Sequence, residues 1–284
     1  MSASVHDTIV PQRVTSDVVV TRAPADARLR FRDVLGYGAL LRALATRDLK
    51  ARYKQSALGP AWVIFQPLAL LIAFSIGFNS VANVQTDGVS YFLFAMVGLT
   101  VWTYFQAAVM ASTGSIVNNY ALVRWTSCPR LALPLATLIA SSPSFAVTSI
   151  VAFIGAIIGG YLWAGTLLAP LLTLWLFILT ASVAVFLAAI SVRARDVLSA
   201  VPFLLQVVLF LAPVAYPTSQ LSSTLQTVIS INPLTGLIDA WRWCLLGIDP
   251  DMTAVGIGLG VTALLVFAAW KTFAAVEVVM SDEI

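Results

Sequence analysis

Long apolar stretches separated by short polar ones make up most of the chain after residue 59. A transmembrane helix needs about 20 mostly apolar residues, so intervals without charged side chains locate the expected spans. Six spans are expected, at 60–80, at 91–115, on either side of residues 159–165 within the charge-free interval 131–192, at 197–216 and at 253–272. The pattern predicts an all-α, polytopic membrane protein with a transmembrane domain over residues 59–284.

The segment before the first span has a different pattern. Over residues 34–54 the apolar positions recur near helical spacing, and Arg and Asp occupy the other face. These apolar positions are Val34, Tyr37, Leu40, Leu41 and Leu44. We therefore expect an interfacial amphipathic helix within residues 31–58, lying in the plane of the membrane. Residues 1–30 lack the apolar region and cleavage site of a signal peptide and are expected to form a disordered cytoplasmic tail.

Residues 217–250 are mildly apolar but too short and too interrupted for a span. One interpretation is a pair of short re-entrant helices, since irregular backbone at membrane depth persists only where protein or water covers it. The alternative is an amphipathic helix on the outer surface, anchored by Trp241 and Trp243. In either case Asp239 and Arg242, three positions apart, are placed to form an ion pair.

Basic residues fix the expected orientation of the chain. Fifteen of the 16 Lys and Arg residues fall on one side of the six-span topology, and Arg242 is the exception. Both termini are therefore expected in the cytoplasm, by the positive-inside rule. The chain is 60% hydrophobic and only 10% charged, with a mean hydropathy of +0.92. Its net charge of +3 reflects this topology, so no nucleic-acid partner is expected.

Several kinds of chemistry are missing from the sequence. No GxxxxGK[ST] loop is present to bind nucleotide phosphates. The single histidine, His6, lies in the tail, and Cys128 and Cys244 fall on opposite sides of the expected topology, so neither a metal site nor a disulfide is expected. No paired carboxylates or nucleophile and base are visible, so an enzyme is not expected. An ion-coupled flippase would need ionisable residues at the span centres, which are absent.

Three segments carry a family resemblance. RDLKARYKQSALGPAWVIFQPL at 47–68 resembles the start of the ABC-2-type polysaccharide and O-antigen export permeases. NNYALVRWTSCPRLALPL at 118–135 is similar to their cytoplasmic loop, although Cys128 stands where an aromatic residue is more usual. PVAYPTS at 213–219, followed by INPLTGLIDAWRW at 231–243, is similar to the segment after their fifth span. The likeness covers nearly the whole chain after residue 30.

The resemblance implies a half-transporter in the cytoplasmic (inner) membrane that forms a homodimer and binds two P-loop ATPase subunits. ATP and Mg²⁺ would be bound by those subunits, with no cofactor in this chain. The loop 118–130 would be the coupling helix that contacts the ATPase, through Asn118, Asn119, Tyr120, Arg124, Trp125 and Arg130. The amphipathic helix would lie at the lipid entrance, with Arg42, Arg47, Lys50, Arg52 and Lys54.

Both of these roles have simpler alternatives. Basic residues on an interfacial helix would equally contact anionic lipid headgroups, and the positive-inside rule alone places arginines in a cytoplasmic loop. Aromatic residues in the first two spans are candidates to line a channel on the dimer axis, because sugar rings stack on aromatic faces. These candidates are Phe65, Phe74, Tyr91, Trp102, Tyr104 and Phe105. The alternative is that they pack against helices or lipid.

The implied cargo is a polysaccharide linked to a polyprenyl lipid. Arg outnumbers Lys by 13 to three, a composition typical of a GC-rich bacterial source, and in actinobacteria this family would include exporters of lipid-linked cell-wall galactan. O-antigen, capsule and teichoic acid remain open as cargoes. An ion-coupled lipid-glycan flippase and a non-transporting membrane scaffold are the alternatives from other functional classes.

Overall fold

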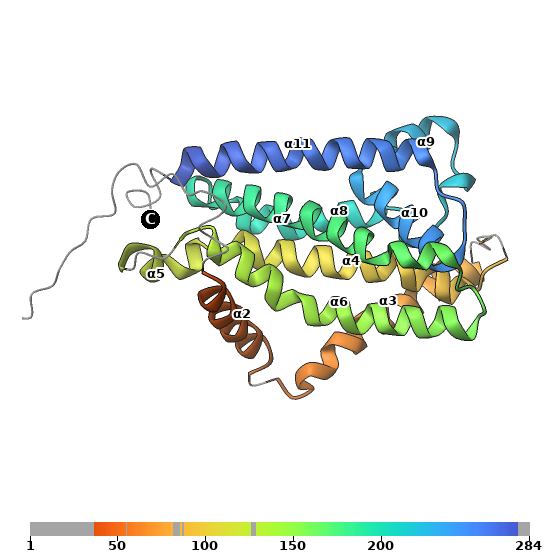
Figure 1. The fold of residues 1–284 in the computed structure, drawn as a ribbon, viewed down its shortest axis with the longest axis horizontal. Helices are drawn as coiled ribbons and strands as arrows, with labels where there is room; N and C mark the ends of the chain where they lie inside the picture. The colour runs from red at the N-terminus through yellow and green to blue at the C-terminus, as the bar shows by residue number, and fades with distance from the viewer. Residues whose placement is uncertain (1–36, 55, 82–85, 87, 126–128, 278–284) are drawn as a thin grey trace, which may run out of the picture.

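The computed structural model describes residues 37–54, 56–81, 86, 88–125 and 129–277. Within these residues the chain forms ten α-helices, most of which run along the long axis of an elongated bundle (Figure 1). They are α2 (Gly38–Tyr53), α3 (Trp62–Phe74), α4 (Tyr91–Thr113), α5 (Tyr120–Trp125), α6 (Ala132–Ile158), α7 (Ala169–Arg193), α8 (Val197–Leu211), α9 (Ser223–Ser230), α10 (Pro233–Leu246) and α11 (Met252–Glu277). The expected 1–30 tail and Cys128 lie outside the described residues.

Four of these helices are long and apolar enough to cross a membrane. They are α4, α6, the η4–α7 unit from Ala164 to Arg193, and α11. They coincide with the second, third, fourth and sixth expected spans. The boundary between the two central ones also falls where the sequence placed it, because α6 ends at Ile158 and Gly160 has a left-handed φ of 71°. The chain is a multi-pass membrane protein.

The first and fifth expected spans are shorter apolar helices. The α3 helix has 13 residues and continues into a π-helical segment, η2 (Ser75–Val81). The α8 helix has 15 residues and ends where the backbone becomes extended at Ala212. At 1.5 Å per residue, α8 alone spans about 22 Å, less than the roughly 30 Å of a hydrocarbon core. The structure is thus all-helical, with four long apolar helices and two shorter ones.

The α4 helix occupies the centre of the bundle. It packs against α3, α6, α7, α8 and α10, and residues around its whole circumference are buried, including Trp102 and Tyr104. A helix that is hydrophobic all round is expected in such a position, because no face of it needs water. This helix carries four of the six aromatic residues considered above as channel lining.

The α10 helix is inserted among α4, α7 and α11 (Figure 1). Asn232 caps its start, where its side-chain oxygen accepts a hydrogen bond from the Leu234 backbone N–H, and Pro233 occupies the first turn. Gly247 ends it with a φ of 72°. Trp241 is only 1% exposed, so on α10 this side chain packs inside the bundle. The two short helices expected between residues 217 and 250 are α9 and α10.

Two opposite ends of the bundle can be distinguished. The α5 helix and the C-terminal end of α11 lie at one end, whereas α9 lies at the other (Figure 1). The first of these ends also carries the turn between α7 and α8, with Arg193, Arg195 and Asp196 exposed. We call it the basic end. The α2 helix lies in the half of the bundle nearest the basic end and packs on α6.

Candidate functional site

A groove lies between α2, α3 and α6. Its volume is about 1160 Å³, and residues from all three helices and from the turn before α3 form its walls. The basic residues Arg47 and Lys50 come from α2, and Lys54 directly follows its last residue. The remaining lining residues are Leu49 and Ala51 of α2, Ala61, Val63 and Ile64 near the start of α3, and Pro143 and Val147 of α6.

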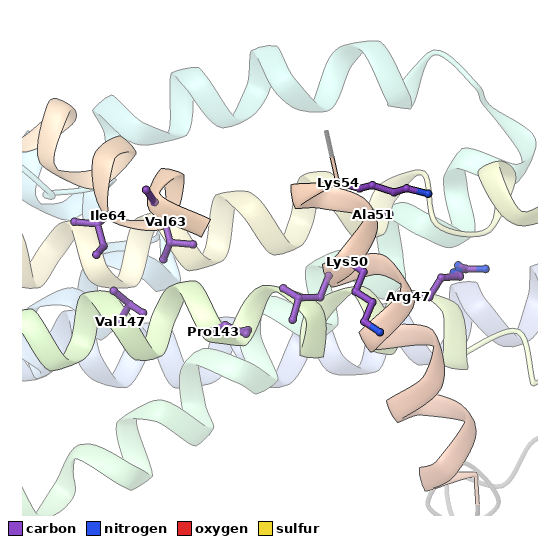
Figure 2. A pocket seen from close by; sticks show the side chains of 10 residues that line it. Arg47, Lys50, Ala51, Lys54, Val63, Ile64, Pro143 and Val147 are labelled. Atoms are coloured by element: carbon purple, nitrogen blue, oxygen red, sulfur yellow. The ribbon is translucent and has the colours of Figure 1, made fainter. Parts of the chain in front are cut away.

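Charge is confined to one side of the groove. In Figure 2, Val63, Ile64, Pro143 and Val147 occupy α3 and α6, and every nitrogen-bearing side chain projects from α2 or its C-terminal end. The charged ends of Arg47 and Lys54 extend away from α3 in this view, so their aliphatic stems line the groove and their charges lie at its rim. The groove thus combines an apolar wall with a cationic edge.

The α2 helix is held in place by its apolar side and by one polar contact. Leu44 and Ala45 are buried in a cluster with residues of α6. Arg52 donates a hydrogen bond from Nη2 to the Ser141 hydroxyl of α6 at 3.2 Å, and Ser141 in turn donates to the Thr137 carbonyl. The predicted amphipathic helix exists from Gly38, but its apolar side packs on protein.

The five residues assigned to the lipid entrance therefore divide into three groups. Arg47, Lys50 and Lys54 line the groove. Arg52 bonds to α6 and helps to hold α2 at the groove. Arg42 is exposed one turn or more before the groove and is not part of its lining. Among the described residues, neither Lys50 nor Lys54 forms an ion pair, so their ammonium groups are free for a ligand.

The expected coupling segment begins at the basic end, directly after α4. Asn119 lies in the short helical turn η3 (Val117–Asn119), and Tyr120 begins α5 with 54% of its surface exposed. Asn118 is also exposed. The backbone of Arg124 and Trp125 completes α5, but their side chains lie outside the described part of the structure. A role for these residues in contacting an ATPase remains a prediction.

Asn119 also connects this segment to the groove. Arg47 Nη2 donates to Asn119 Oδ1 at 2.9 Å, across 72 positions in the sequence. Asn119 Nδ2 donates to the Ser115 carbonyl at 2.8 Å, at the end of α4. Arg47 also bonds to its neighbour Asp48, with 3.0 Å between Nε and Oδ1. The Arg47 side chain thus lines the groove and also bonds to the coupling segment.

Arg130, the last residue of the expected coupling loop, contacts the end of the final helix. Its Nη1 donates to the backbone carbonyl of Glu277, the last residue of α11. A cation at a helix C-terminus is favourable because the last carbonyls there lack backbone donors. Arg130 therefore ties the coupling loop to α11.

The channel-lining candidates are found mainly in the interior of the single chain. Tyr91, Trp102, Tyr104 and Phe105 are between 0% and 6% exposed. Phe74 is half-buried, with its ring 5.7 Å from the ring of Phe78. Phe65 alone among the six is well exposed, at 57%. In this structure the four α4 aromatics pack in the core of the single chain, and a role for them in lining a passage between two protomers remains a prediction.

The ion pair expected within residues 217–250 is present and buried. Arg242 Nη1 lies 3.6 Å from Asp239 Oδ1, and the two side chains are only 2% and 9% exposed. Arg242 Nη2 also donates to the Val214 carbonyl at 2.8 Å, and its guanidinium lies 3.5 Å from the centre of the Phe94 ring. Trp241 is buried beside this pair, and Trp243 is half-buried with its ring 4.8 Å from that of Trp163.

Sequence reasoning missed the α4 side of this cluster. A Cβ atom on Gly98 would lie 2.8 Å from the Val214 carbonyl oxygen and 3.1 Å from Arg242 Nη2, so only glycine allows this approach. The available signal was a glycine within an otherwise bulky apolar span, which often marks close packing. Within the described residues, no group of three or more His, Cys, Asp or Glu side chains is placed to hold a metal ion.

Comparison with known proteins identifies the relatives of this chain. The sequence model described as "ABC-2 type transporter" matches residues 39–246. An O-antigen export system permease protein RfbA from Klebsiella pneumoniae is 26% identical over 209 residues, which cover 72% of this chain and 78% of that protein. The RfbA permease of Myxococcus xanthus is 27% identical over 214 residues, covering 74% of this chain and 82% of that protein. The matched region includes the groove, the coupling segment and the Asp239–Arg242 pair.

Proposed function

We propose that this chain, which belongs to the ABC-2 type transporter family and is the permease subunit of an ABC exporter, moves a polysaccharide linked to a polyprenyl lipid out of the cytoplasm. Permeases of this family lack nucleotide-binding sites, so the energy comes from ATP and Mg²⁺ bound by a partner ATPase. Two permease chains and two ATPase subunits would form the working unit in the cytoplasmic membrane, with both termini of this chain in the cytoplasm.

The groove of α2, α3 and α6 is the observation that carries this proposal. Its volume of about 1160 Å³ slightly exceeds the roughly 300–1,000 Å³ of pockets that enclose a drug-sized molecule. Its basic residues belong to the α2 side, and α2 lies in the half of the bundle nearest the basic end (Figure 1). A long lipid would place only part of its chain in such a groove, and the rest would stay in the bilayer.

The cationic edge would supply the selectivity. A polyprenyl chain gains little by moving from bilayer to groove, since lipid tails are as apolar as the Val and Ile side chains that would contact it. A phosphate or diphosphate headgroup, by contrast, would meet Arg47, Lys50 and Lys54 together. Each basic residue near an anionic headgroup contributes about 1 kcal/mol. Headgroup charge would therefore decide which lipids remain in the groove.

The cargo sugar is the less determined part of the proposal. The named relatives are O-antigen export permeases, which supports a glycan of that general kind. A galactan, capsule or teichoic acid that is linked to a polyprenyl phosphate would present the same headgroup chemistry to the groove. We propose that the groove recognises the lipid phosphate and apolar chain, and that sugar identity is left to contacts elsewhere.

The test is ATP hydrolysis by the permease and its ATPase subunit in vesicles. Polyprenyl diphosphate-linked glycan should stimulate the wild-type complex. The K50Q/K54Q variant should need a lipid concentration higher by roughly thirtyfold for half-maximal stimulation, because two headgroup contacts are lost. The matched control is Arg195→Gln, an exposed basic residue outside the groove.

Other outcomes would contradict the proposal. If the lipid-linked glycan does not change ATP hydrolysis by the wild-type complex, this class of cargo is excluded. Equal stimulation of the K50Q/K54Q and wild-type complexes would remove the groove from substrate recognition. A K50Q/K54Q variant that responds less to all anionic lipids alike would assign the groove to bulk anionic lipid, so vesicles with phosphatidylglycerol and no glycan complete the experiment.

A further inference from the structure

We propose that Arg47 is a lipid-responsive latch: it holds the coupling segment through Asn119 when the groove is empty and releases it when a phosphate headgroup occupies the rim. The inference rests on the proposed function above and adds to it a route by which lipid binding reaches the ATPase. Its basis is that one guanidinium both lines the groove and bonds to the segment that follows α4.

The Asn119 amide is oriented from both sides. A guanidinium has only donors, so the side-chain oxygen of Asn119 must face Arg47. The amide nitrogen then donates to the Ser115 carbonyl. The contact between Arg47 and Asn119 therefore joins α2 to Ser115, in the turn that follows α4, through a side chain that has one hydrogen-bonding arrangement.

The segment around Asn119 has little freedom to move alone. The Asn118 backbone N–H bonds to the Gly114 carbonyl, and a Cβ on Gly114 would lie 2.8 Å from the Asn118 side-chain nitrogen. The chain thus turns tightly off α4 before α5 begins at Tyr120. Any force on Asn119 is carried directly to the start of α5 because η3 and α5 are continuous.

Arg47 is suited to exchange partners. Its side chain is 44% exposed, so it can rotate without opening a core. Asn119 offers a neutral amide oxygen, whereas a phosphate offers charged oxygens that match the guanidinium fork, and such charge-assisted bonds are about twice as strong as neutral ones. Asp48, the other partner of Arg47, is its sequence neighbour and moves with α2. A headgroup at the rim would therefore compete with Asn119 and leave α2 intact.

Lys50 and Lys54 provide a built-in comparison. Both line the same groove, but among the described residues neither contacts the coupling segment. Their replacement should change how much lipid is needed, whereas a change at Asn119 should alter how hydrolysis depends on lipid. The two roles are separable because, in the part of the chain that the structure describes, no hydrogen bond joins either lysine side chain to this segment, whereas the Asn119 side chain bonds to Arg47 and to the Ser115 carbonyl.

Two substitutions at Asn119 test the latch in opposite directions. N119A removes the acceptor for Arg47, so basal ATP hydrolysis by the vesicle-bound complex should rise by about fivefold, which is the lower end of coupling factors between linked sites. Lipid should then stimulate hydrolysis little further. N119D keeps the size and gives Arg47 a carboxylate, so basal hydrolysis should stay low and stimulation by polyprenyl diphosphate-linked glycan should fall by a similar factor. Lipid binding, measured by photo-crosslinking of the lipid chain, should be tighter in the alanine variant than in wild type, because Asn119 no longer competes with the headgroup for Arg47.

The outcomes separate this proposal from the one before it. If either Asn119 variant keeps the wild-type basal rate and the wild-type stimulation while the wild-type complex responds to the lipid, the latch is overturned and the groove assignment stands. If the lipid does not stimulate ATP hydrolysis by the wild-type complex, the result contradicts the proposed cargo and not the latch. Should N119A fail to assemble with the ATPase, N119D alone decides, since it keeps the side-chain size and an acceptor for Arg47 and loses only the donation to the Ser115 carbonyl.

Discussion

Arg242 and Arg47 are both arginines, but their side chains lie in very different environments. Arg242, inside the bundle on α10, is 2% exposed and is enclosed by Asp239, the Val214 carbonyl and the Phe94 ring. Arg47, at the basic end, is 44% exposed and its partner outside α2 is one neutral amide. Removing an enclosed charge partner leaves the other charge without water, whereas an exposed arginine can exchange one partner for another. The enclosed Arg242 is therefore suited to hold α10 in a fixed position. The exposed Arg47 is suited to exchange partners when a ligand binds.

The region around α10 is built for close contact throughout. Gly98 admits Val214 and Arg242, and a Cβ on Gly236 would lie 2.3 Å from the Ala254 carbonyl oxygen of α11. Around the groove, in contrast, Ile64 and Phe65 are exposed and α2 approaches α6 through one apolar side. We infer that α10 moves with α4 and α11 as one unit, and that α2 and α3 are the elements able to shift.

The largest expected effect is at the buried pair. Arg242→Met should lower the stability of the protein by about 3–5 kcal/mol, because Asp239 then remains buried without a counter-charge. The measurement is thermal unfolding of purified protein in detergent. The D239N/R242M double variant should recover most of the loss, since no net charge is left inside. An unfolding temperature for R242M equal to that of wild type would contradict the rigid role, and Arg195→Met is the exposed control.

A second prediction compares two aromatic residues that the sequence treats alike. Trp102 is 0% exposed and Phe65 is 57% exposed. Trp102→Ala should cost about 3–5 kcal/mol of stability through the cavity it leaves, with export lost in proportion to folded protein. Phe65→Ala should leave the unfolding temperature close to wild type, so any change in export would concern cargo contact. Stability and export are measured on the same preparations. Unchanged stability of W102A would contradict the core role of Trp102, and a loss of export at unchanged stability would favour its role in the channel.

Local patterns in the sequence account for what could be predicted. Charge-free intervals located the helices, and Asp239 and Arg242 could be paired because helical residues three apart are neighbours. The Gly159 and Gly160 pair marked the turn after α6 because glycine adopts positive φ readily.

Tertiary contacts account for what could not be predicted. The α4 helix is apolar on every side, so no pattern distinguishes core from channel at Trp102. The groove requires α2, α3 and α6 to meet, and the bond between Arg47 and Asn119 joins positions 72 residues apart. The sequence could assign Arg47 to a basic, membrane-facing helix, but it offered no sign of the amide that Arg47 contacts.

The smallest expected effect is at Arg130, whose bond to the Glu277 carbonyl tests whether contacts at the basic end are as replaceable as that of Arg47. Arg130→Ala should lower stability by only about 0.3–1 kcal/mol, the usual contribution of a cation at an accessible helix C-terminus. Hydrogen exchange should show faster opening confined to the last turn of α11, with the α10 region unchanged. Arg130→Lys should recover part of the protection, because the ammonium group keeps the charge and can still donate but lacks the planar fork of the guanidinium. If R130A instead destabilised the whole bundle as much as R242M, the basic end would be as rigid as the buried pair, and the contrast between fixed and exchangeable arginines would not describe this protein.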